Sequence, residues 1–345
     1  MHEALLYDRL SNQKVQCNVC RRRCVIPEGK RGFCWTRLNE RGTLYSLAYG
    51  QVSFMSVAPI EKKPLYHFYP GSYAMSFGTL GCNFRCPGCQ NWDIAHAKID
   101  LEAVATEYIS PEESITLAKR HHCQGMSWTY NEPTVWFEYT LDGAKLSKKE
   151  RLYTTYVTNG YMTTEALNMI GPYLDSFRVD IKGFSENTYQ RIANVSEFTG
   201  ILEITKAAKE KWGMWVEIVT NIIPGYNDDT ATLKKIASWI ASDLGMNTPW
   251  HVTQFVPHLR LSNLAPTPVS TLERAQTIGR DAGLPYVYIG NIPAHPGQNT
   301  YCPTCNELLI ERHNFGPLRN ELAPGGICPG CGHELPGRFS AENKT

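Results

Sequence analysis

Short apolar runs alternate with longer amphipathic stretches through the middle of the chain, from Ser72 to about Ile292. The runs are rich in Val, Ile, Tyr, Phe and Trp, which is typical of strands, and helical stretches lie between most of them. Because alternating strands and helices usually form a parallel sheet with right-handed crossovers, this pattern predicts an α/β core. The predicted strands span residues 72–79, 125–130, 152–157, 176–181, 214–220, 250–256 and 286–290.

Six β/α units fit between the first strand and Gly283, which is too few for a closed eight-stranded barrel. We therefore expect a partial (β/α)6 barrel that is open at one side. Several helix starts have capping signals, with a Ser followed three residues later by Glu or with a run of Asn and Asp. These signals are Ser110 with Glu113, Ser270 with Glu273, and Asn227-Asp-Asp229.

Two cysteine-rich segments flank the predicted core. Residues 1–71 contain four cysteines and few helical signals, and a Pro-Gly turn closes this segment. Residues 293–345 contain two C-x2-C pairs separated by a polar, hairpin-like stretch. The sequence therefore predicts three domains, at residues 1–71, 72–292 and 293–345.

Composition and charge bear on where the protein is located and on what it binds. The chain has 345 residues, of which 42% are hydrophobic, and its net charge is +1. Charge or Pro interrupts each apolar run well short of the roughly 20 residues that span a bilayer, and the N-terminus has no signal-peptide pattern. We expect a cytoplasmic protein that does not enter a membrane, and the small net charge disfavours nucleic acid as a partner.

Eleven of the twelve cysteines fall into three tight clusters, which indicates metal binding in a chain without a secretion signal. Cys123 is the exception and is expected to be a small buried hydrophobe. Cys82, Cys86 and Cys89 have the spacing C-x3-C-x2-C with no fourth cysteine nearby. Three thiolates can hold three irons of a 4Fe-4S cluster and leave the fourth iron open for chemistry. A zinc site completed by a distant residue is the alternative.

Polar motifs follow the next three predicted strands. They are Tyr130-Asn-Glu-Pro133, Thr158-Asn-Gly160 and Asp180-Ile-Lys182. Each alone is weak, because Glu-Pro often begins a helix, Asn-Gly is usually a turn and Asp-x-Lys is usually an ion pair. In parallel β/α folds, however, catalytic groups lie in the loops after the strand ends. Because the three motifs follow successive strands in order, we predict that they form one site together with the cysteine triplet.

With these motifs, the segment from about Ser72 to Ile292 resembles the radical S-adenosylmethionine (SAM) superfamily. The resemblance implies that the amino and carboxylate groups of SAM chelate the open iron, and that the reduced cluster cleaves SAM to methionine and a 5'-deoxyadenosyl radical. It also implies that Asn131 and Glu132 stand where the family's Gly-Gly-Glu motif binds the SAM ammonium group. The other cofactor-binding residues that the resemblance implies are Asn159, Asp180, Lys182, Ile223, Gly225 and His258.

One position departs from the family pattern. Many members have an aromatic residue immediately before the third cysteine, where it packs near adenine, and this chain has Gly88 there. We therefore expect the adenine contacts to come partly from elsewhere, with Trp92 and the loop near Tyr226 as candidates.

Motifs outside the core narrow the resemblance. The run Pro59-Ile-Glu-Lys-Lys-Pro-Leu-Tyr-His-Phe-Tyr-Pro-Gly71, the Cys-Gln-Asn-Trp that begins at Cys89, and a Cys-Pro-Thr-Cys followed by Ile310-Glu-Arg312 resemble the radical SAM component of the AmmeMemoRadiSam system. That family is related to the pyruvate formate-lyase activating enzymes. The narrower resemblance covers nearly the whole chain and does not identify a substrate.

The two flanking cysteine clusters have separate interpretations. Cys302, Cys305, Cys328 and Cys331 form two C-x2-C knuckles, which suit a closed structural site for zinc or a single iron. For Cys17, Cys20, Cys24 and Cys34, zinc is the first interpretation. An auxiliary iron–sulfur cluster that relays electrons or binds substrate is the alternative, and free thiols are the third.

Together these features predict a radical SAM enzyme that modifies an unactivated carbon of a protein or peptide, with a reductant such as ferredoxin or flavodoxin. Cobalamin-assisted C-methylation is the leading subcase, although the Asp-x-His-x2-Gly signature of a conventional cobalamin domain does not occur. Activation of a glycyl-radical enzyme is one alternative. A non-catalytic, metal-stapled binding module is another.

Overall fold

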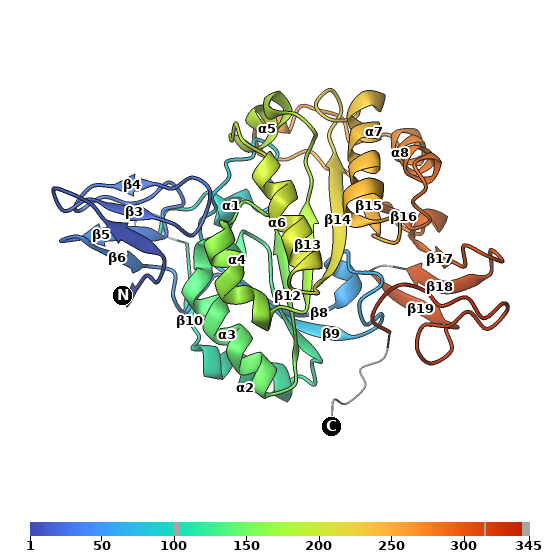
Figure 1. The fold of residues 1–345 in the computed structure, drawn as a ribbon, viewed down its shortest axis with the longest axis horizontal. Helices are drawn as coiled ribbons and strands as arrows, with labels where there is room; N and C mark the ends of the chain where they lie inside the picture. Colours follow the sequence, from blue (N-terminus) through green and yellow to red (C-terminus); the bar gives the residue numbers. More distant parts are fainter. Residues whose placement is uncertain (100–103, 314, 340–345) are drawn as a thin grey trace.

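An eight-stranded sheet forms the centre of the molecule in the computed structural model, which describes residues 1–99, 104–313 and 315–339. Small sheets of the N-terminal segment lie on one side of this core, and a three-stranded C-terminal sheet lies on the other (Figure 1). The functional residues predicted above therefore lie on a central scaffold with a cysteine-rich appendage at each side.

Seven of the eight central strands run parallel, in the order β16-β15-β14-β13-β12-β11-β9. Each predicted strand of the core corresponds to one of them, so this part of the prediction is confirmed. The strands are β9 (Tyr73–Gly78), β11 (Gly125–Trp128), β12 (Tyr153–Thr158), β13 (Ser176–Asp180), β14 (Trp215–Ile222), β15 (Trp250–Gln254) and β16 (Val287–Gly290).

Helices connect the successive parallel strands and cover the sheet, which makes six β/α units. Two helices connect β13 to β14, and a short helix follows the cysteine loop after β9. The helices are α1 (Trp92–Ala95), α2 (Pro111–Arg120), α3 (Phe137–Lys149), α4 (Thr164–Ile170), α5 (Glu186–Ala193), α6 (Thr199–Glu210), α7 (Thr230–Trp239) and α8 (Val269–Asp281).

The eighth strand, β8 (Phe54–Pro59), pairs antiparallel with β9 at one edge of the sheet. The sequence analysis had assigned these residues to the N-terminal segment. Among the described strands, β8 and β16 are the two edges and do not pair with each other, so the sheet is open. The α/β fold class is confirmed, whereas the division into domains at residues 71 and 292 stays a prediction.

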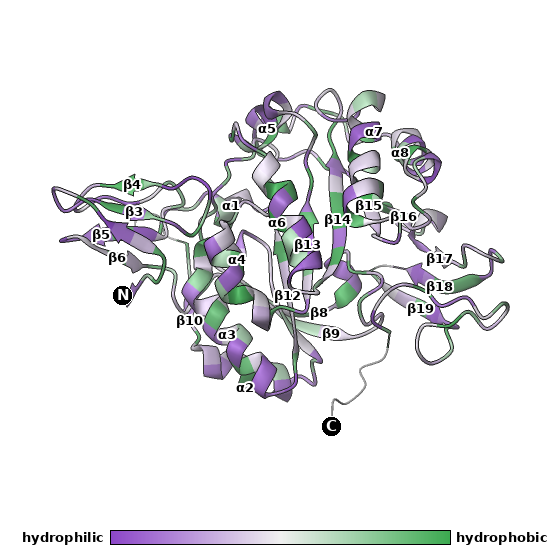
Figure 2. Ribbon diagram, viewed as in Figure 1, coloured by the Kyte–Doolittle hydropathy of each residue, from purple (hydrophilic) through white to green (hydrophobic). Residues whose placement is uncertain are grey.

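Large apolar side chains fill the space between the sheet and its helices. Trp128, Tyr156, Phe177 and Trp250, on four different strands, are all at most 1% exposed. Hydrophobic residues follow the central strands and the inner faces of the helices in Figure 2. Because burial of each such side chain contributes about 1.5–3 kcal/mol, this core fixes the strand ends that carry the polar motifs.

Two of the three predicted helix caps are confirmed. Ser110 Oγ accepts a hydrogen bond from Glu113 N at 3.1 Å, and Asp229 Oδ1 accepts one from Thr232 N at 2.8 Å. The Ser270 cap is wrong, because α8 begins one residue earlier and Pro268 occupies the cap position. Proline fixes its own φ near the value that a helix start needs, so the helix can begin before the serine.

The N-terminal segment forms two small antiparallel sheets and part of a third. Arg37 on one of these strands forms a buried ion pair with Glu138 of α3, with 2.7 Å between Nη1 and Oε2. Because breaking a buried pair leaves an uncompensated charge, this contact holds the segment firmly against the core. The strands are β1 (His2–Glu3), β2 (Tyr7–Arg9), β3 (Val15–Cys17), β4 (Val25–Ile26), β5 (Arg37–Glu40), β6 (Thr43–Ser46), and β7 (Gln51–Val52), which pairs with β10 (Glu107–Tyr108).

The C-terminal sheet consists of β17 (Thr300–Tyr301), β18 (Leu308–His313) and β19 (Gly316–Asn320). Buried Arg312 donates hydrogen bonds to Tyr66 O at 3.0 Å and Thr300 Oγ1 at 2.7 Å. His67 joins Tyr288 Oη at 2.6 Å and Pro336 O at 2.7 Å. These contacts dock the sheet against the core.

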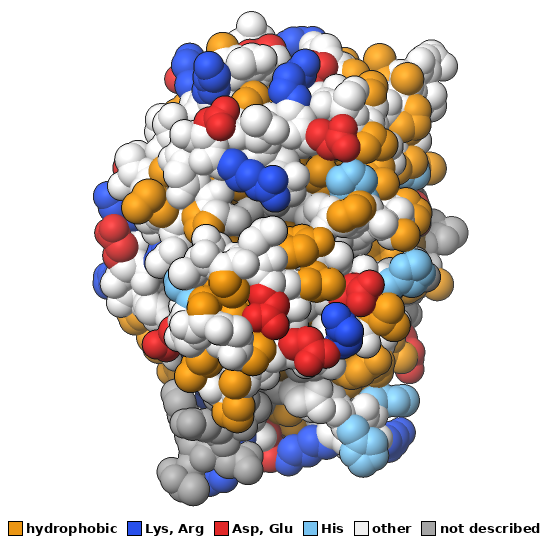
Figure 3. All heavy atoms as spheres, turned by 90° about the vertical axis from the view of Figure 1, so that its right-hand side faces the viewer, with side chains coloured by type: hydrophobic (Ala, Val, Ile, Leu, Met, Phe, Trp, Pro, Cys, Tyr) orange, Lys and Arg blue, Asp and Glu red, His pale blue; other side chains and the backbone are white. Residues whose placement is uncertain are grey.

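Charged side chains of both signs are mixed with hydrophobic ones on the face that carries the C-terminal sheet and α8 (Figure 3). The described residues of this face therefore form no extended surface of one charge. No helix in the described part of the chain has the length and hydropathy that a membrane span requires.

Glu61 provides a test of this packing, because its side chain is only 1% exposed. Its Oε1 accepts a hydrogen bond from Gly71 N at 2.7 Å, whereas Oε2 has no partner among the described residues. Burial raises the pKa of Glu61 from 4.5 to about 7, although Arg312 opposes the shift. Between these two values the folded protein binds more protons than the unfolded chain, so stability is lost as the pH rises through that window.

We therefore expect Glu61→Gln, which keeps the neutral form, to gain stability relative to the parent protein between about pH 5 and pH 8, by on the order of 3 kcal/mol. Urea unfolding at several pH values measures this difference. The exposed Glu107→Gln variant is the control and should show a constant difference. A constant difference for Glu61→Gln as well would contradict the assignment.

Candidate functional site

Cys82, Cys86 and Cys89 lie in the loop that joins β9 to α1, and all three are half-buried. Phe84 N lies 3.3 Å from Cys82 Sγ, and Cys89 N donates to Cys86 O at 3.3 Å, so the loop folds back on its own cysteines. Burial raises the pKa of all three thiols, that of Cys89 to about 12. Three thiolates in this setting require positive charge, which a metal cluster supplies.

Asn131 holds the base of this loop. Its Nδ2 donates to Gly81 O at 2.8 Å, and its Oδ1 accepts from Thr79 N at 3.2 Å. Both polar groups of the side chain therefore bind the backbone that leads into Cys82. The assignment of Asn131 as a contact of the SAM ammonium group stays a prediction.

Glu132 is fully buried at the end of β11, where its carboxylate accepts four hydrogen bonds. Oε1 accepts from Thr134 N, Thr134 Oγ1 and Thr158 Oγ1, at 3.0, 2.6 and 2.7 Å. Oε2 accepts one, from Asn159 N at 2.7 Å, and retains acceptor capacity. Burial raises the pKa of Glu132, and these hydrogen bonds oppose the shift.

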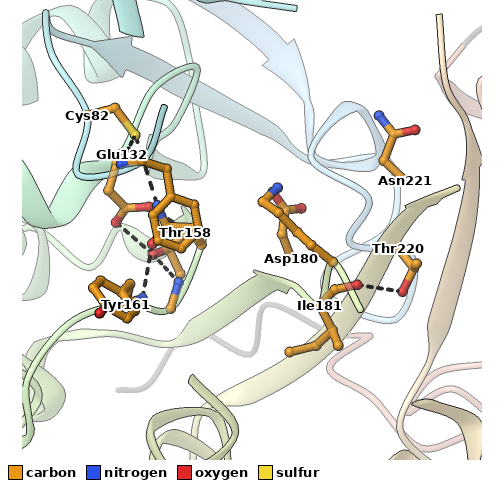
Figure 4. A network of polar contacts seen from close by, with 12 residues as sticks. Cys82, Glu132, Thr158, Tyr161, Asp180, Ile181, Thr220 and Asn221 are labelled. Carbon is orange, nitrogen blue, oxygen red and sulfur yellow. Dashed lines mark hydrogen bonds and ion pairs between the residues drawn. The ribbon is translucent and has the colours of Figure 1, made fainter. Parts of the chain in front are cut away.

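Asn159 connects the end of β12 to the cysteine loop. Its Nδ2 donates to Asn83 Oδ1 at 2.7 Å and lies 4.0 Å from Cys82 Sγ, while its Oδ1 accepts from Tyr161 N at 3.0 Å. Cys82, Glu132, Thr158 and Tyr161 lie together in Figure 4, with Asp180 on the neighbouring strand. The predicted convergence of the first three strand ends is therefore observed.

Asp180, the last residue of β13, forms an ion pair with Lys182, with 3.0 Å between Oδ2 and Nζ. Arg178 forms a second ion pair with the same carboxylate, at 2.5 Å. Although burial opposes ionisation, Arg178 and Lys182 hold the pKa of Asp180 below its usual value. Burial also opposes the charge of Lys182, but Asp180 and then Cys86 raise the pKa of this lysine. Lys182 is therefore a permanent cation next to the cysteine triplet.

Ile223, Gly225 and His258 follow β14 and β15. Ile223 is buried, and its N donates to Asn227 Oδ1 at 2.6 Å, which holds the turn. Gly225 has φ +76°, a left-handed conformation that favours glycine. His258 begins the short 3-10 helix Leu259–Leu261, and the neighbouring Arg260 N donates to Pro87 O at 2.9 Å. That hydrogen bond brings this loop against the cysteine loop.

An apolar wall explains why residue 88 is a glycine. A Cβ at Gly88 would lie 2.9 Å from Phe255 Cε2 and 3.0 Å from Leu261 Cδ1. Phe255 and Leu261 pack with Ile223, and Tyr226 packs against them. The wall beside the third cysteine is thus built from the loops after β14 and β15. Of the two adenine candidates, Tyr226 contacts this wall, whereas Trp92 is 47% exposed.

Several polar residues of the sheet escaped the sequence analysis. Lys63 is 3% exposed, and its Nζ lies 4.8 Å from the centre of the Tyr130 ring. Tyr130 Oη in turn lies 2.7 Å from Ser56 Oγ of β8. Burial lowers the pKa of Lys63 to about 7, and the charges of Lys62 and Arg178 add to the shift. The local signals of this group are Ser56, the single polar residue within 54–59, and the alternation of polar and apolar residues within 176–180.

The C-terminal cysteines form the predicted four-cysteine site. Their Sγ atoms all lie within 4.8 Å of one another, with Cys302 and Cys331 at 3.5 Å and Cys305 and Cys328 at 3.6 Å. A tetrahedral zinc with bonds of about 2.3 Å places sulfurs roughly 3.8 Å apart, so the quartet fits one ion. Burial acts to raise the pKa of Cys302. The backbone N–H groups of Cys305 and Thr304 outweigh it and lower this pKa to about 7, which favours the thiolate. The choice between zinc and iron stays a prediction.

The N-terminal cysteines also come together. Cys17, Cys20, Cys24 and Cys34 line one cavity, which the side chain of Arg37 borders. The prediction that these four residues bind metal is compatible with this arrangement and is considered further below.

These features together define a class of metal-dependent α/β protein. They are a parallel sheet, a three-cysteine loop after its first parallel strand, polar groups at the next strand ends, and a compact four-cysteine site. Residues 77–236 match the family model of the radical SAM superfamily. An uncharacterized protein of Methanocaldococcus jannaschii is 42% identical over 336 residues, which cover 97% of this chain and 99% of that protein.

Two more distant similarities agree with that match. A putative glycyl-radical enzyme activating enzyme of Methanocaldococcus jannaschii is 25% identical over 182 residues, covering 52% of this chain and 66% of that protein. The crystal structure of a radical SAM methyltransferase from Sphaerobacter thermophilus superposes with a TM-score of 0.51 at 16% identity, over 67% of this chain and 71% of that chain. The chain belongs to the radical SAM superfamily, and its resemblance to the activating enzymes is confirmed. Membership implies a 4Fe-4S cluster and SAM.

The wall beside the third cysteine can be tested with Gly88→Ala. We expect a loss of about 1–3 kcal/mol in stability and weaker binding of SAM, because the added methyl group must displace Phe255 or Leu261. Gly316→Ala is the matched control, since no atom lies within 4 Å of its added Cβ. Thermal unfolding and SAM titration measure the two effects, and equal behaviour of the two variants would refute the packing.

The tail site can be tested with Cys302→Ser/Cys305→Ser. Removing two of four ligands should release the bound ion, so metal analysis should show one zinc or iron fewer per chain. Cys123→Ala, outside the three clusters, should keep the full metal content. Unchanged metal in the double variant would show that the tail binds none.

Proposed function

We propose that this protein is a radical SAM enzyme that modifies an unactivated carbon of a protein or peptide. The observation that carries the proposal is the convergence of Glu132, Asn159 and Lys182, from three successive strand ends, on the loop of Cys82, Cys86 and Cys89. When bound, a 4Fe-4S cluster with SAM on its open iron supplies an electron that cleaves SAM to a 5'-deoxyadenosyl radical, which abstracts a hydrogen atom.

The donor set of the site fits this pair of cofactors. The loop supplies three thiols and no fourth cysteine lies near them in the sequence, which leaves them as an incomplete ligand set. SAM carries one ammonium and one carboxylate group. The spare acceptor on Glu132 Oε2 suits the ammonium, and the permanent charge of Lys182 suits the carboxylate.

The remaining residues orient SAM and exclude water. The wall of Ile223, Phe255 and Leu261 offers an apolar surface next to the third cysteine, which suits adenine. Asp180, held between Arg178 and Lys182, is fixed as an acceptor for a ribose hydroxyl group. Asn131 and Asn159 keep the cysteine loop in place and, with Gly225 and His258, complete the proposed cofactor contacts.

The open sheet and its two appendages favour a macromolecular substrate. Buried Lys63, with Tyr130 and with Ser56 of β8, gives a polar surface that suits an acidic or carbonyl group of a peptide. Activation of a glycyl-radical enzyme is the second candidate, favoured by the likeness to a putative activating enzyme. Cobalamin-assisted C-methylation is a subcase of the main proposal, and a ferredoxin or flavodoxin is the proposed reductant.

Anaerobic reconstitution with iron and sulfide, followed by reduction in the presence of SAM, tests the reaction. We expect 5'-deoxyadenosine from the parent protein, because the cluster must reduce SAM, and none from Cys82→Ala/Cys86→Ala/Cys89→Ala. Liquid chromatography with mass detection measures the product. A parent protein that retains its cluster and forms no 5'-deoxyadenosine would sink the proposal.

The roles of Glu132 and Lys182 can be tested by SAM binding. We expect Glu132→Gln and Lys182→Met each to weaken binding by about tenfold or more, since each loses a charge-assisted hydrogen bond of roughly 1.5–3 kcal/mol. The iron–sulfur absorption should remain, and the exposed Lys206→Met serves as the control. Loss of the cluster itself in either variant would contradict a role in binding SAM.

A further inference from the structure

The four cysteines of the N-terminal segment line a single cavity between the small sheets and the cysteine loop of the core. Cys17 and Cys34 are buried, and Cys20 and Cys24 are half-buried. All four are free thiols. Four thiols that face one cavity without forming disulfides indicate a site for metal rather than a covalent staple.

The spacing of these thiols differs from that of the tail. Among the described residues, the tail quartet forms a group whose ligand atoms all lie within 4.8 Å of one another, and the N-terminal thiols form no such group. Cys82, Cys86 and Cys89 do not form one either. A single zinc draws its sulfurs to roughly 3.8 Å, whereas each thiolate of an iron–sulfur cube binds a different iron and stands farther from the next. Both the N-terminal quartet and the triplet are thus less compact than the tail quartet, which is compatible with a cluster that binds one iron per thiolate.

A buried polar group without a partner borders the same cavity. Asn83 is 1% exposed, and its Nδ2 has no hydrogen-bond partner among the described residues. Its Oδ1 is already bound by Asn159, so Nδ2 remains as a donor. Burying an unmade hydrogen bond costs about 1–3 kcal/mol, and the sulfide of a cluster would accept it. A metal-bound thiolate can accept it as well, so this donor marks a sulfur-rich site, and the choice of metal rests on the other observations.

The cavity shares a wall with the site of the radical SAM cluster. Asn83 directly follows Cys82, and Gly81 packs so closely on Cys34 that an added Cβ would lie 2.3 Å from Cys34 O. Arg85 bridges the two sites, since its guanidinium donates to Cys82 O at 2.7 Å and to Phe33 O at 2.8 Å. The backbone of Cys34 therefore packs directly against the loop that carries Cys82, so the two cysteine sets lie side by side.

Positive charge surrounds the cavity. Arg22 donates from Nε to Asn83 O at 2.6 Å, and both Arg22 and Arg85 lie over the ring of Phe33, at 3.5 and 4.7 Å. Arg37 also lines the cavity, although Glu138 already pairs with its guanidinium. An iron–sulfur cluster with four thiolates carries net negative charge, which these cations offset.

We propose that Cys17, Cys20, Cys24 and Cys34 hold an auxiliary iron–sulfur cluster that passes electrons to the radical SAM centre. Four cysteine ligands leave no iron open for a substrate, and the contact with the loop of the triplet favours electron transfer over a purely structural role. One electron from a reduced ferredoxin or flavodoxin reduces the auxiliary cluster, which returns to its oxidised state when it reduces the cluster of the triplet. No bond or proton is exchanged. The relay rests on the proposed function, whereas the cluster site does not.

The cluster site can be tested without any SAM chemistry, in the variant Cys82→Ala/Cys86→Ala/Cys89→Ala. After anaerobic reconstitution, we expect acid-labile sulfide, with an equal amount of iron beyond any single ion in the tail, and an electron paramagnetic resonance signal on reduction. Adding Cys20→Ala/Cys24→Ala should remove the sulfide and the signal, with folding checked by circular dichroism. The tail cannot mimic this result, because a single ion carries no sulfide. Zinc in place of iron, or no sulfide, would overturn the proposal.

The relay can be tested with Cys20→Ala/Cys24→Ala in the protein that keeps its triplet. We expect 5'-deoxyadenosine to form at least tenfold more slowly with reduced flavodoxin and at the parent rate with dithionite, which reaches the triplet directly. Equal rates with flavodoxin would overturn the relay. If the parent protein forms no 5'-deoxyadenosine at all, the proposed function fails, while the sulfide measurement still decides whether the cluster site exists.

Discussion

The buried carboxylate of Glu132 is the constraint on which the site depends. A charge with 1% exposure must be satisfied by hydrogen bonds, and its four donors come from its own loop and from the end of β12. The hydrogen bond from Asn159 N to Glu132 fixes the position of Asn159. The side chain of Asn159 in turn binds Asn83, the residue after Cys82. One electrostatic requirement thus aligns two strand ends and the cysteine loop before any cofactor binds.

The flanking cysteine segments extend this arrangement in different ways. The tail quartet is compact, closed and docked through Arg312 and His67 on the core, which suits a structural ion. The N-terminal quartet lies directly against the cysteine loop, through Cys34 and Gly81, and Arg85 binds both. This position is the basis of the proposed electron relay.

Much of the fold and the centre of the site could be predicted, because the period of the strands and the cysteine spacing are local signals. The seven parallel strands and the loops of Glu132, Asn159 and Lys182 followed from them. What escaped prediction depends on contacts between distant segments. Strand β8 joins the sheet through pairing with β9, and Phe255 fills the space beside Gly88 from a loop far along the chain. Ser270 failed as a cap because a neighbouring proline set the helix start.

The central claim is that the iron left open by Cys82, Cys86 and Cys89 binds SAM through its amino and carboxylate groups. Electron-nuclear double resonance on the reduced protein, with SAM labelled with nitrogen-15 at the amino group, measures that contact directly. The account predicts a hyperfine coupling between the cluster and the labelled nitrogen. A protein that binds SAM and shows no such coupling would contradict it.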